Sequence, residues 1–234
     1  MARREFQSCV TLRNKIDPVQ KVLLKEFCIL VDEKDTILGK ASKRKCHQLD
    51  SKGKSLLHRA FSLFIFNEKN ELLLQRRSKT KITFPGFWTN TCCSHPLFDV
   101  PGESNGVIGA KTASRRRVFN ELGIQPESLP LEKIQFLTRI LYAAPSQCKI
   151  WGENELDYIM IFKGNVVINP NPEEVYEVLY LKYEDLSDFV KEESSKGTLT
   201  PWFEIISKEF LPRWWKSIDN LESFVDKDKI HSFY

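Results

Sequence analysis

The sequence lacks any apolar run that approaches the ~20 residues needed to span a bilayer. We therefore expect no membrane partner. The basic N-terminus, MARREFQSCVTLRNK, is followed by no apolar segment, so we expect no secretory signal peptide. The last residues, HSFY, do not match the peroxisomal tripeptide. These observations predict a cytoplasmic protein, with the peroxisome as the alternative compartment.

The sequence also lacks the patterns of a disulfide framework and of a nucleic-acid-binding protein. Its six cysteines include no CxxC pair, and Cys92 and Cys93 are adjacent, which indicates reduced thiols. A net charge of +4 is too small to indicate nucleic acid by itself. The aromatic residues lack the repeated basic spacing of a base-stacking groove. We expect no nucleic-acid partner.

The 234 residues, 41% hydrophobic and 28% charged, are those of an ordinary globular chain without internal repeats. Strands with one embedded helix, followed by further helices, predict a single α+β domain around a mixed sheet. Residues 1–25 are expected to be a loosely ordered leader or a short helix, before a domain over 26–234. Strands are predicted at 27–31, 36–39, 60–67, 72–77, 134–143, 156–162 and 175–181, and helices at 107–122, 184–196 and 202–210. Gly123 and Gly197 are expected to end the first two helices, and Pro212 to interrupt the last.

Chemistry-bearing residues are concentrated in the segment TFPGFWTNTCCSHP at 83–96. In a strand, Cys93 and His95 would share one face, and Cys92 would point to the other. A thiol beside a histidine can be a nucleophile, a metal ligand or an acid/base group. A cysteine-protease triad is disfavoured, because His95 is badly placed to be the base for a thiol two residues away.

A second set of residues has the composition of a metal site. Three of the four histidines, His47, His58 and His95, lie in separate segments of the chain, although a single histidine is usually a core or surface residue. Glu153 and Glu155 are two apart at the start of a strand, so their carboxylates face the same way and need a cation or a proton between them. Together they would suit Mg²⁺, Mn²⁺ or Zn²⁺.

Basic residues flank both sets. KASKRKCH at 40–47 precedes His47, and Arg76, Arg77, Lys79 and Lys81 precede the cysteine segment. A solvated loop or surface is one interpretation. The other is a set of contacts to an anionic ligand.

The segment RRRVFNELGI at 115–124 resembles the end of a Nudix box, but most of the glutamates of the box are absent. Gly102, Arg116, Val118, Glu121, Gly123 and Ile124 fit it, whereas Ile108, Arg117 and Asn120 stand where it has glutamate. In Nudix pyrophosphohydrolases those carboxylates hold Mg²⁺ on a diphosphate. Their replacement here indicates a chain that binds a diphosphate without cleaving it.

Taken together, the motifs resemble type I isopentenyl-diphosphate Δ-isomerases of the eukaryotic kind. The resemblance covers roughly residues 25–215, and CSHP with WGENE is its most specific part. It is carried by LLHRAFSLFIFN (56–67), LLLQRRSKTKITFPGFWTNTCCSHP (72–96), RRRVFNELGI (115–124), WGENELDYI (151–159) and TPWF (200–203).

The resemblance implies a Nudix-like α/β/α sandwich that interconverts isopentenyl and dimethylallyl diphosphate. By motif position, Cys93 and Glu155 match the two proton-transfer groups, and Tyr142 matches a tyrosine bonded to the carboxylate. The Trp202 ring would face a carbocation. The implied metal ligands are His47, His58, His95, Glu153 and Glu155, with Glu121 near a second Mg²⁺ carried by the diphosphate. The implied diphosphate contacts are Lys43, Arg77, Lys81, Ser94 and Arg117.

Two other functions stay open at this point. One is a Nudix pyrophosphohydrolase, and the other is a binding module in which the histidines and glutamates hold a structural metal. A small prenyl diphosphate is the expected partner of an isomerase, acting as a monomer or a weak dimer.

Overall fold

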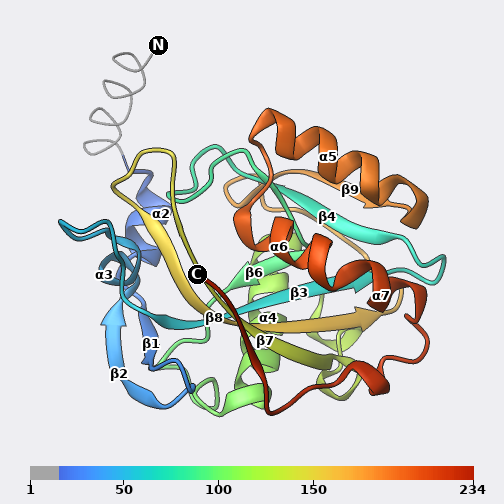
Figure 1. Cartoon of the computed structure of the whole chain (residues 1–234), viewed down its shortest axis with the longest axis horizontal. Coiled ribbons are helices and arrows are strands. Elements are labelled where there is room, and N and C mark those ends of the chain that lie inside the picture. The colour runs from blue at the N-terminus through green and yellow to red at the C-terminus, as the bar shows by residue number, and fades with distance from the viewer. Residues whose placement is uncertain (1–15) are drawn as a thin grey trace.

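The computed structural model describes residues 16–234. Over that range, ten strands form one mixed sheet with helices on both faces (Figure 1). The strands are β1 (Phe27–Val31), β2 (Ile37–Ser42), β3 (His58–Phe66), β4 (Leu72–Arg77), β5 (Trp88–Thr89), β6 (Cys92–Ser94), β7 (Gln135–Pro145), β8 (Gly152–Lys163), β9 (Val175–Leu181) and β10 (Ile230–Phe233). The helices are α2 (Pro18–Leu23), α3 (Lys43–His47), α4 (Gly106–Leu122), α5 (Leu186–Lys196), α6 (Pro201–Glu209) and α7 (Leu211–Lys216). The predicted single-domain α+β fold is confirmed.

The sheet runs in the order β10-β7-β8-β3-β1-β2, and β3 is its centre. β3 pairs parallel to β8 and antiparallel to β4 and β6. All nine positions of β3 are buried, because its near-continuous apolar sequence packs on both faces. The strands that carry the cysteine and glutamate motifs are therefore immediate neighbours.

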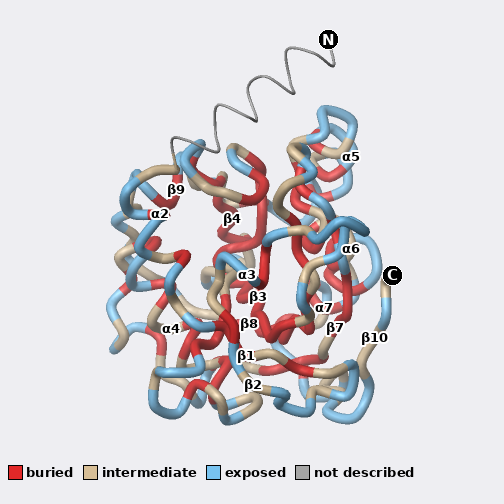
Figure 2. The backbone as a smooth tube through the Cα atoms, turned by 90° about the vertical axis from the view of Figure 1, so that its left-hand side faces the viewer, coloured by how far each residue is buried: buried red, intermediate tan, exposed pale blue. Residues whose placement is uncertain are grey.

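Two apolar cores lie on opposite faces of the sheet, as Figure 2 shows with α4 on one side and α5, α6 and α7 on the other. α4 contributes Ala110, Val118 and Leu122 to one core. α6 and α7 contribute the aromatic residues of the other core, including Phe203 and Trp215. This arrangement is the predicted α/β/α sandwich.

The predicted helix ends follow from backbone geometry. Gly123 and Gly197 cap α4 and α5 in the left-handed region, with φ of 66° and 65°, where glycine has no steric penalty. Pro201 occupies the first turn of α6. Pro212 likewise lies in the first turn of α7, after α6 has already ended at Glu209. The break between the two helices therefore precedes Pro212.

Several predicted boundaries need correction. The interpretation of 40–47 as a loop is wrong, although Arg44 and Lys45 are solvated as expected: β2 continues to Ser42, and Lys43–His47 is a helix. The Ser42 side chain caps this helix by accepting a hydrogen bond from the Lys45 N–H, and His47 is buried. β10 was not predicted, because it is a short edge strand without apolar alternation.

The N-terminal segment was expected to be loose or to form a short helix. Its first fifteen residues lie outside the described part of the chain. From there on, Asp17 caps the short helix α2 by accepting hydrogen bonds from two backbone N–H groups. Among residues 16–234, no helix has the length and apolarity needed to cross a membrane.

Candidate active site

Five buried side chains from four parts of the chain meet at one end of the sheet. His47 comes from α3, His58 begins β3, His95 follows β6, and Glu153 and Glu155 lie on β8. Their ligand-type nitrogen and oxygen atoms all lie within 4.8 Å of one another. The three imidazole rings are 4.8–4.9 Å apart between centroids. The structure therefore brings together all five residues that the sequence indicated as a metal-type set.

Strand register explains most of this convergence. His58 on β3 is the partner of Glu155 on β8, and Glu155 is also the partner of Tyr142 on β7. These three residues lie side by side across three strands. An isolated bridge between Gln48 and Trp151 ties the end of α3 to the start of β8. That bridge brings His47 to Glu153, with 3.0 Å between His47 Nε2 and Glu153 Oε2.

Backbone contacts set the tautomers of two of the histidines. His47 Nδ1 lies 2.7 Å from the carbonyl of Lys43, and His58 Nδ1 lies 2.8 Å from the carbonyl of Leu56. A carbonyl can only accept, so both Nδ1 atoms carry the proton in the neutral ring. In that neutral form each Nε2 presents a lone pair to the cluster, which is the arrangement of metal-binding histidines.

The buried carboxylates need positive charge nearby. Glu155 Oε1 lies 2.7 Å from His95 Nε2 and 3.6 Å from His58 Nε2, and the Tyr142 hydroxyl donates to Glu155 Oε2. Burial raises the pKa of Glu155, but the positive charge of His58 and the hydrogen bond from Tyr142 outweigh it and hold the pKa below its usual value. Burial and the charge of Lys43 hold the pKa of His95 well below its usual value, so this ring is neutral.

The donor set fits a divalent cation. Glu153 Oε2, His58 Nε2 and His95 Nδ1 are buried without a hydrogen-bond partner. Buried polar atoms are normally paired, so an unpaired group of nitrogen and oxygen atoms at one point indicates a missing positive partner. Imidazole nitrogens with carboxylate oxygens suit Mn²⁺ and Zn²⁺, and carboxylates also suit Mg²⁺. We conclude that this is a candidate divalent-metal site.

The two adjacent cysteines point to opposite faces, as the strand pattern predicted. Cys92 packs in the core beneath α4, whereas Cys93 packs against the other core and lines the pocket. Cys93 Sγ lies 3.7 Å from an Arg77 nitrogen and 3.8 Å from Thr89 Oγ1. Burial raises the pKa of the Cys93 thiol to about 12, and the charge of Arg77 opposes the rise. The thiol therefore keeps its proton at neutral pH.

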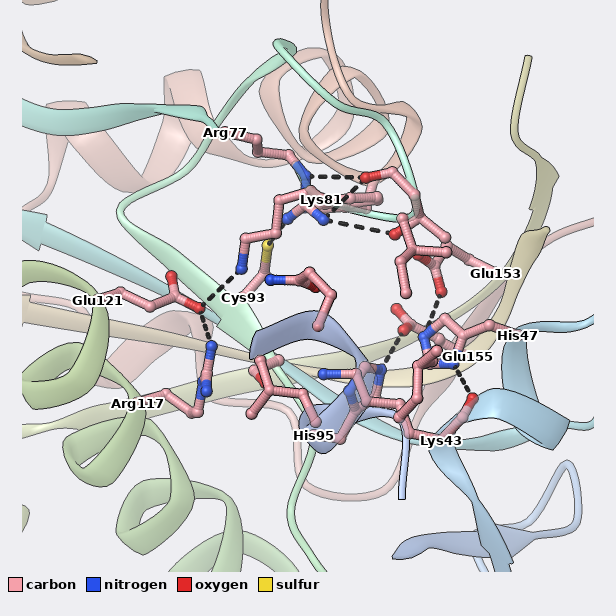
Figure 3. A pocket seen from close by; sticks show the side chains of 17 residues that line it. Lys43, His47, Arg77, Lys81, Cys93, His95, Arg117, Glu121, Glu153 and Glu155 are labelled. Atoms are coloured by element: carbon pink, nitrogen blue, oxygen red, sulfur yellow. Dashed lines mark hydrogen bonds and ion pairs between the residues drawn. The ribbon is translucent and has the colours of Figure 1, made fainter. Parts of the chain in front are cut away.

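Across the pocket from the histidines lies a second charged cluster, in which Arg117 and Glu121 face Lys81 (Figure 3). Lys81 Nζ contacts Glu174 and lies 3.5 Å from Glu121 Oε1. Arg117 contacts Glu121 and lies 3.4 Å from Glu174. Burial raises the pKa of Glu121, but Lys81 and Arg117 outweigh it and hold the pKa far below its usual value.

One pocket joins the two clusters. It is an open pocket whose space free of protein atoms, counted out to the surrounding solvent, is about 640 Å³. Most of the site residues predicted from the sequence line it, whereas His58 and Tyr142 lie behind the lining and contact Glu155. The predicted lining residues are Lys43, His47, Arg77, Lys81, Cys93, Ser94, His95, Arg117, Glu121, Glu153, Glu155 and Trp202.

The basic residues upstream of the cysteines separate into two groups. Arg77 and Lys81 face the pocket. Arg76 instead pairs with Glu177, and Lys79 is exposed above the Tyr176 ring. The solvated interpretation therefore holds for Arg76 and Lys79. Lys43, from the segment misread as a loop, also lines the pocket.

Two of the buried polar residues that sequence reasoning missed lie in loops near the pocket. Glu174 lies in the segment before β9, where the Glu173–Glu174 pair looks like an exposed acidic pair, yet Glu174 is only 3% exposed. Asn90 is fully buried inside the cysteine segment. No residue pattern distinguishes either one from an ordinary loop residue.

Comparison with known proteins identifies the fold class of this protein. The family model described as NUDIX domain matches residues 56–203. The crystal structure of DR0079 from Deinococcus radiodurans superposes with a TM-score of 0.56 at 16% identity, covering 78% of this chain and 98% of that one. The fold is therefore that of a NUDIX domain.

Curated relatives narrow the class further. Isopentenyl-diphosphate Delta-isomerase 1 of Mesocricetus auratus is 49% identical, over 92% of this chain and 96% of the relative. The isopentenyl-diphosphate delta-isomerase of Schizosaccharomyces pombe is 47% identical, over 90% and 92%. A chloroplastic isopentenyl-diphosphate Delta-isomerase II of Arabidopsis thaliana is 45% identical, over 92% and 78%. The chain belongs to the isopentenyl-diphosphate Delta-isomerase family, as predicted.

Proposed function

We propose that the chain interconverts isopentenyl diphosphate and dimethylallyl diphosphate by adding one proton to the alkene and removing another. The observation that carries this proposal is one pocket that holds a thiol, a carboxylate and a group of cationic side chains. The names of the relatives support it. The pyrophosphohydrolase alternative rests on the fold alone, because this chain lacks most glutamates of the Nudix box.

Cys93 and Glu155 are the proposed proton-transfer groups. Isomerisation adds a proton to the terminal carbon of the alkene, passes through a tertiary carbocation, and removes a proton from the neighbouring methylene carbon. Before substrate binds, the thiol carries a proton and the carboxylate does not. Tyr142 donates a hydrogen bond to Glu155 and so orients the carboxylate. The Trp202 ring lines the same pocket, and its negative π-face, over which the Arg77 guanidinium lies at 5.6 Å, would also stabilise the carbocation.

The cationic side chains are the proposed diphosphate contacts. Lys43, Arg77, Lys81 and Arg117 line the pocket together with Ser94. Glu121 lies among these cations, so a diphosphate would meet a negative charge there unless it brought a cation of its own. We therefore assign Glu121 to a Mg²⁺ that enters with the diphosphate.

His47, His58, His95, Glu153 and Glu155 would hold the second divalent ion, which is Mg²⁺, Mn²⁺ or Zn²⁺. When bound, this ion would supply the positive charge that the two buried carboxylates need. The Nε2 atoms of His47 and His58 already face the cluster, so the neutral rings would need little rearrangement to bind this ion.

Metal binding has a test that does not depend on activity. Adding Mg²⁺, Mn²⁺ or Zn²⁺ to chelator-treated protein is expected to raise its stability by about 2.7 kcal/mol at a metal concentration 100 times Kd. His47→Gln should lose most of this gain. His231→Gln is the matched control, because His231 is the histidine outside the cluster. Equal metal-induced shifts of the unfolding temperature in both variants would contradict the site.

Lys81 gives a test of the diphosphate contacts. Lys81→Gln is expected to raise KM for isopentenyl diphosphate roughly 10- to 100-fold, because a hydrogen bond to a charged group contributes roughly 1.5–3 kcal/mol. Lys79 is two positions before Lys81, and its side chain is exposed. Lys79→Gln therefore removes one positive charge outside the pocket and should leave KM nearly unchanged. Steady-state kinetics of both variants show whether KM depends on a lysine inside the pocket or only on the net charge of the protein. Equal KM values in the two variants would contradict the proposed contact of Lys81 with the diphosphate.

Incubation with isopentenyl diphosphate and Mg²⁺, followed by proton and phosphorus NMR, tests the function itself. We expect dimethylallyl diphosphate with its diphosphate intact. Release of inorganic phosphate with an unmoved double bond would instead support the pyrophosphohydrolase.

The compartment and the oligomeric state stay predictions. We propose a cytoplasmic protein, with the peroxisome as the alternative, and a monomer or weak dimer. Imaging of a tagged chain and sedimentation velocity would check them.

A further inference from the structure

Asn90 connects the strand that carries Cys93 to the helix that carries Trp202. Its side chain is fully buried, and its amide nitrogen donates to the carbonyls of Leu63 and Cys92 at 3.0 and 2.9 Å. These two acceptors fix which way the amide faces, because only its nitrogen can donate. The Asn90 oxygen then accepts the indole N–H of Trp202 at 3.0 Å. Both donors of the amide are therefore used, and Trp202 is bound directly to it.

Thr89 extends this connection to the thiol. The Thr89 hydroxyl donates to the Asn90 oxygen at 2.9 Å. A hydroxyl has one proton to give, so the Thr89 oxygen must act as acceptor toward its other neighbours. Those neighbours are Thr200 Oγ1 at 3.0 Å and Cys93 Sγ at 3.8 Å. The Thr89 hydroxyl thus lies against Cys93 Sγ, and its own orientation follows from its contact with Asn90.

We propose that Asn90 and Thr89 are positioning residues for the isomerisation: Asn90 holds the Trp202 indole, and Thr89 holds the Cys93 sulfur in place. This inference rests on the proposed function. Neither residue lines the pocket, so both act through the side chains that do. Their contacts connect two side chains of the pocket. One is Cys93, the proposed proton-transfer group, and the other is Trp202, whose ring would face the carbocation. The relative placement of those two groups then depends on one amide.

A network that only stabilises the fold would behave differently. Trp215 provides the comparison, because its indole N–H donates to the carbonyl of Asn70 at 2.7 Å and its side chain is equally buried. It packs against Phe66 outside the pocket lining. Trp215→Phe thus removes a similar hydrogen bond from the same core without touching the pocket.

The test measures kcat, KM for isopentenyl diphosphate and the unfolding temperature in four variants. Thr89→Val keeps the shape of the side chain and removes its hydroxyl, whereas Thr89→Ser keeps the hydroxyl. We expect Asn90→Leu and Thr89→Val to lower kcat by about 10²-fold, the effect of a small misplacement of reacting groups. KM should stay close to that of the unmodified chain, since neither residue faces the diphosphate contacts. Thr89→Ser should retain kcat, and Trp215→Phe should lower the unfolding temperature while retaining kcat.

The outcomes separate this inference from the proposed function. If the unmodified chain forms no dimethylallyl diphosphate, the proposed function fails and the inference fails with it. If the unmodified chain is active and Thr89→Val retains its kcat, the inference alone is overturned. A Thr89→Ser variant as slow as Thr89→Val would also overturn it, because the hydroxyl would then be irrelevant. If Asn90→Leu does not fold, the two Thr89 variants decide.

Discussion

A Cys93→Ala chain is expected to lose almost all isomerisation while keeping its fold. The thiol lines the pocket beside Arg77, and alanine has no proton to exchange there. General acid or base groups typically contribute about 10²–10⁴-fold to a rate, so turnover should fall within that range or further. The measurement is the rate of dimethylallyl diphosphate formation at saturating substrate.

Cys92→Ala is the matched control for this variant. It deletes the same sulfur atom one residue away, on the opposite face of β6, where Cys92 is packed in the core beneath α4. We expect it to lower the unfolding temperature by leaving a small cavity, and to retain most of the turnover. An active Cys93→Ala chain would remove the thiol from the mechanism.

The second large effect is expected for Glu155→Gln. Glutamine keeps the shape of the side chain but cannot accept the proton, and it weakens the contacts to His58 and His95. Because the substitution affects proton transfer and the candidate metal site together, turnover should fall by about 10⁴-fold, the upper end of the range for such groups. Metal binding should weaken in parallel, which calorimetry of the unloaded protein would show.

Glu193→Gln is the control for Glu155→Gln. Glu193 is also a buried carboxylate, hydrogen-bonded by Thr198 at 2.6 Å and Lys196 at 2.8 Å in and after α5. Neutralising it should reduce stability and leave both turnover and metal binding intact. A Glu155→Gln chain that kept the activity of the Glu193→Gln chain would contradict the role of the carboxylate.

The elements that the sequence predicted well are those whose patterns are local. The strand over 60–67 is a continuous apolar run, and β3 is indeed buried along its length. The helix before Gly123 ends where the backbone turns left-handed. The opposite directions of Cys92 and Cys93 follow from the alternation of a strand. Each of these features depends on a few neighbouring residues.

The features that the sequence did not predict depend on distant parts of the chain. α3 forms among charged residues because Ser42 caps it and its C-terminal side packs beside β8. β10 exists because β7 offers a free edge in parallel register. Glu174 is buried only because Lys81 and Arg117 converge on it from other elements. Asn90 likewise depends on partners in β3 and α6.

The candidate site was predicted in part from the sequence. Residue types and motif order identified its members, and the resemblance assigned their roles. Distances could not be read from the sequence, since His47 reaches Glu153 through the bridge between Gln48 and Trp151. The family and fold predicted from the motifs are confirmed by the comparisons, whereas the roles of the individual residues stay predictions.

The most direct test of the account is incubation of the unmodified chain with isopentenyl diphosphate and Mg²⁺ in D₂O. If the alkene takes a proton from a group that exchanges with solvent, dimethylallyl diphosphate should form and carry deuterium in a methyl group. Mass spectrometry and deuterium NMR would measure this incorporation, with the Cys93→Ala chain as the blank. Unchanged, unlabelled isopentenyl diphosphate in the presence of the folded, metal-loaded chain would contradict the account.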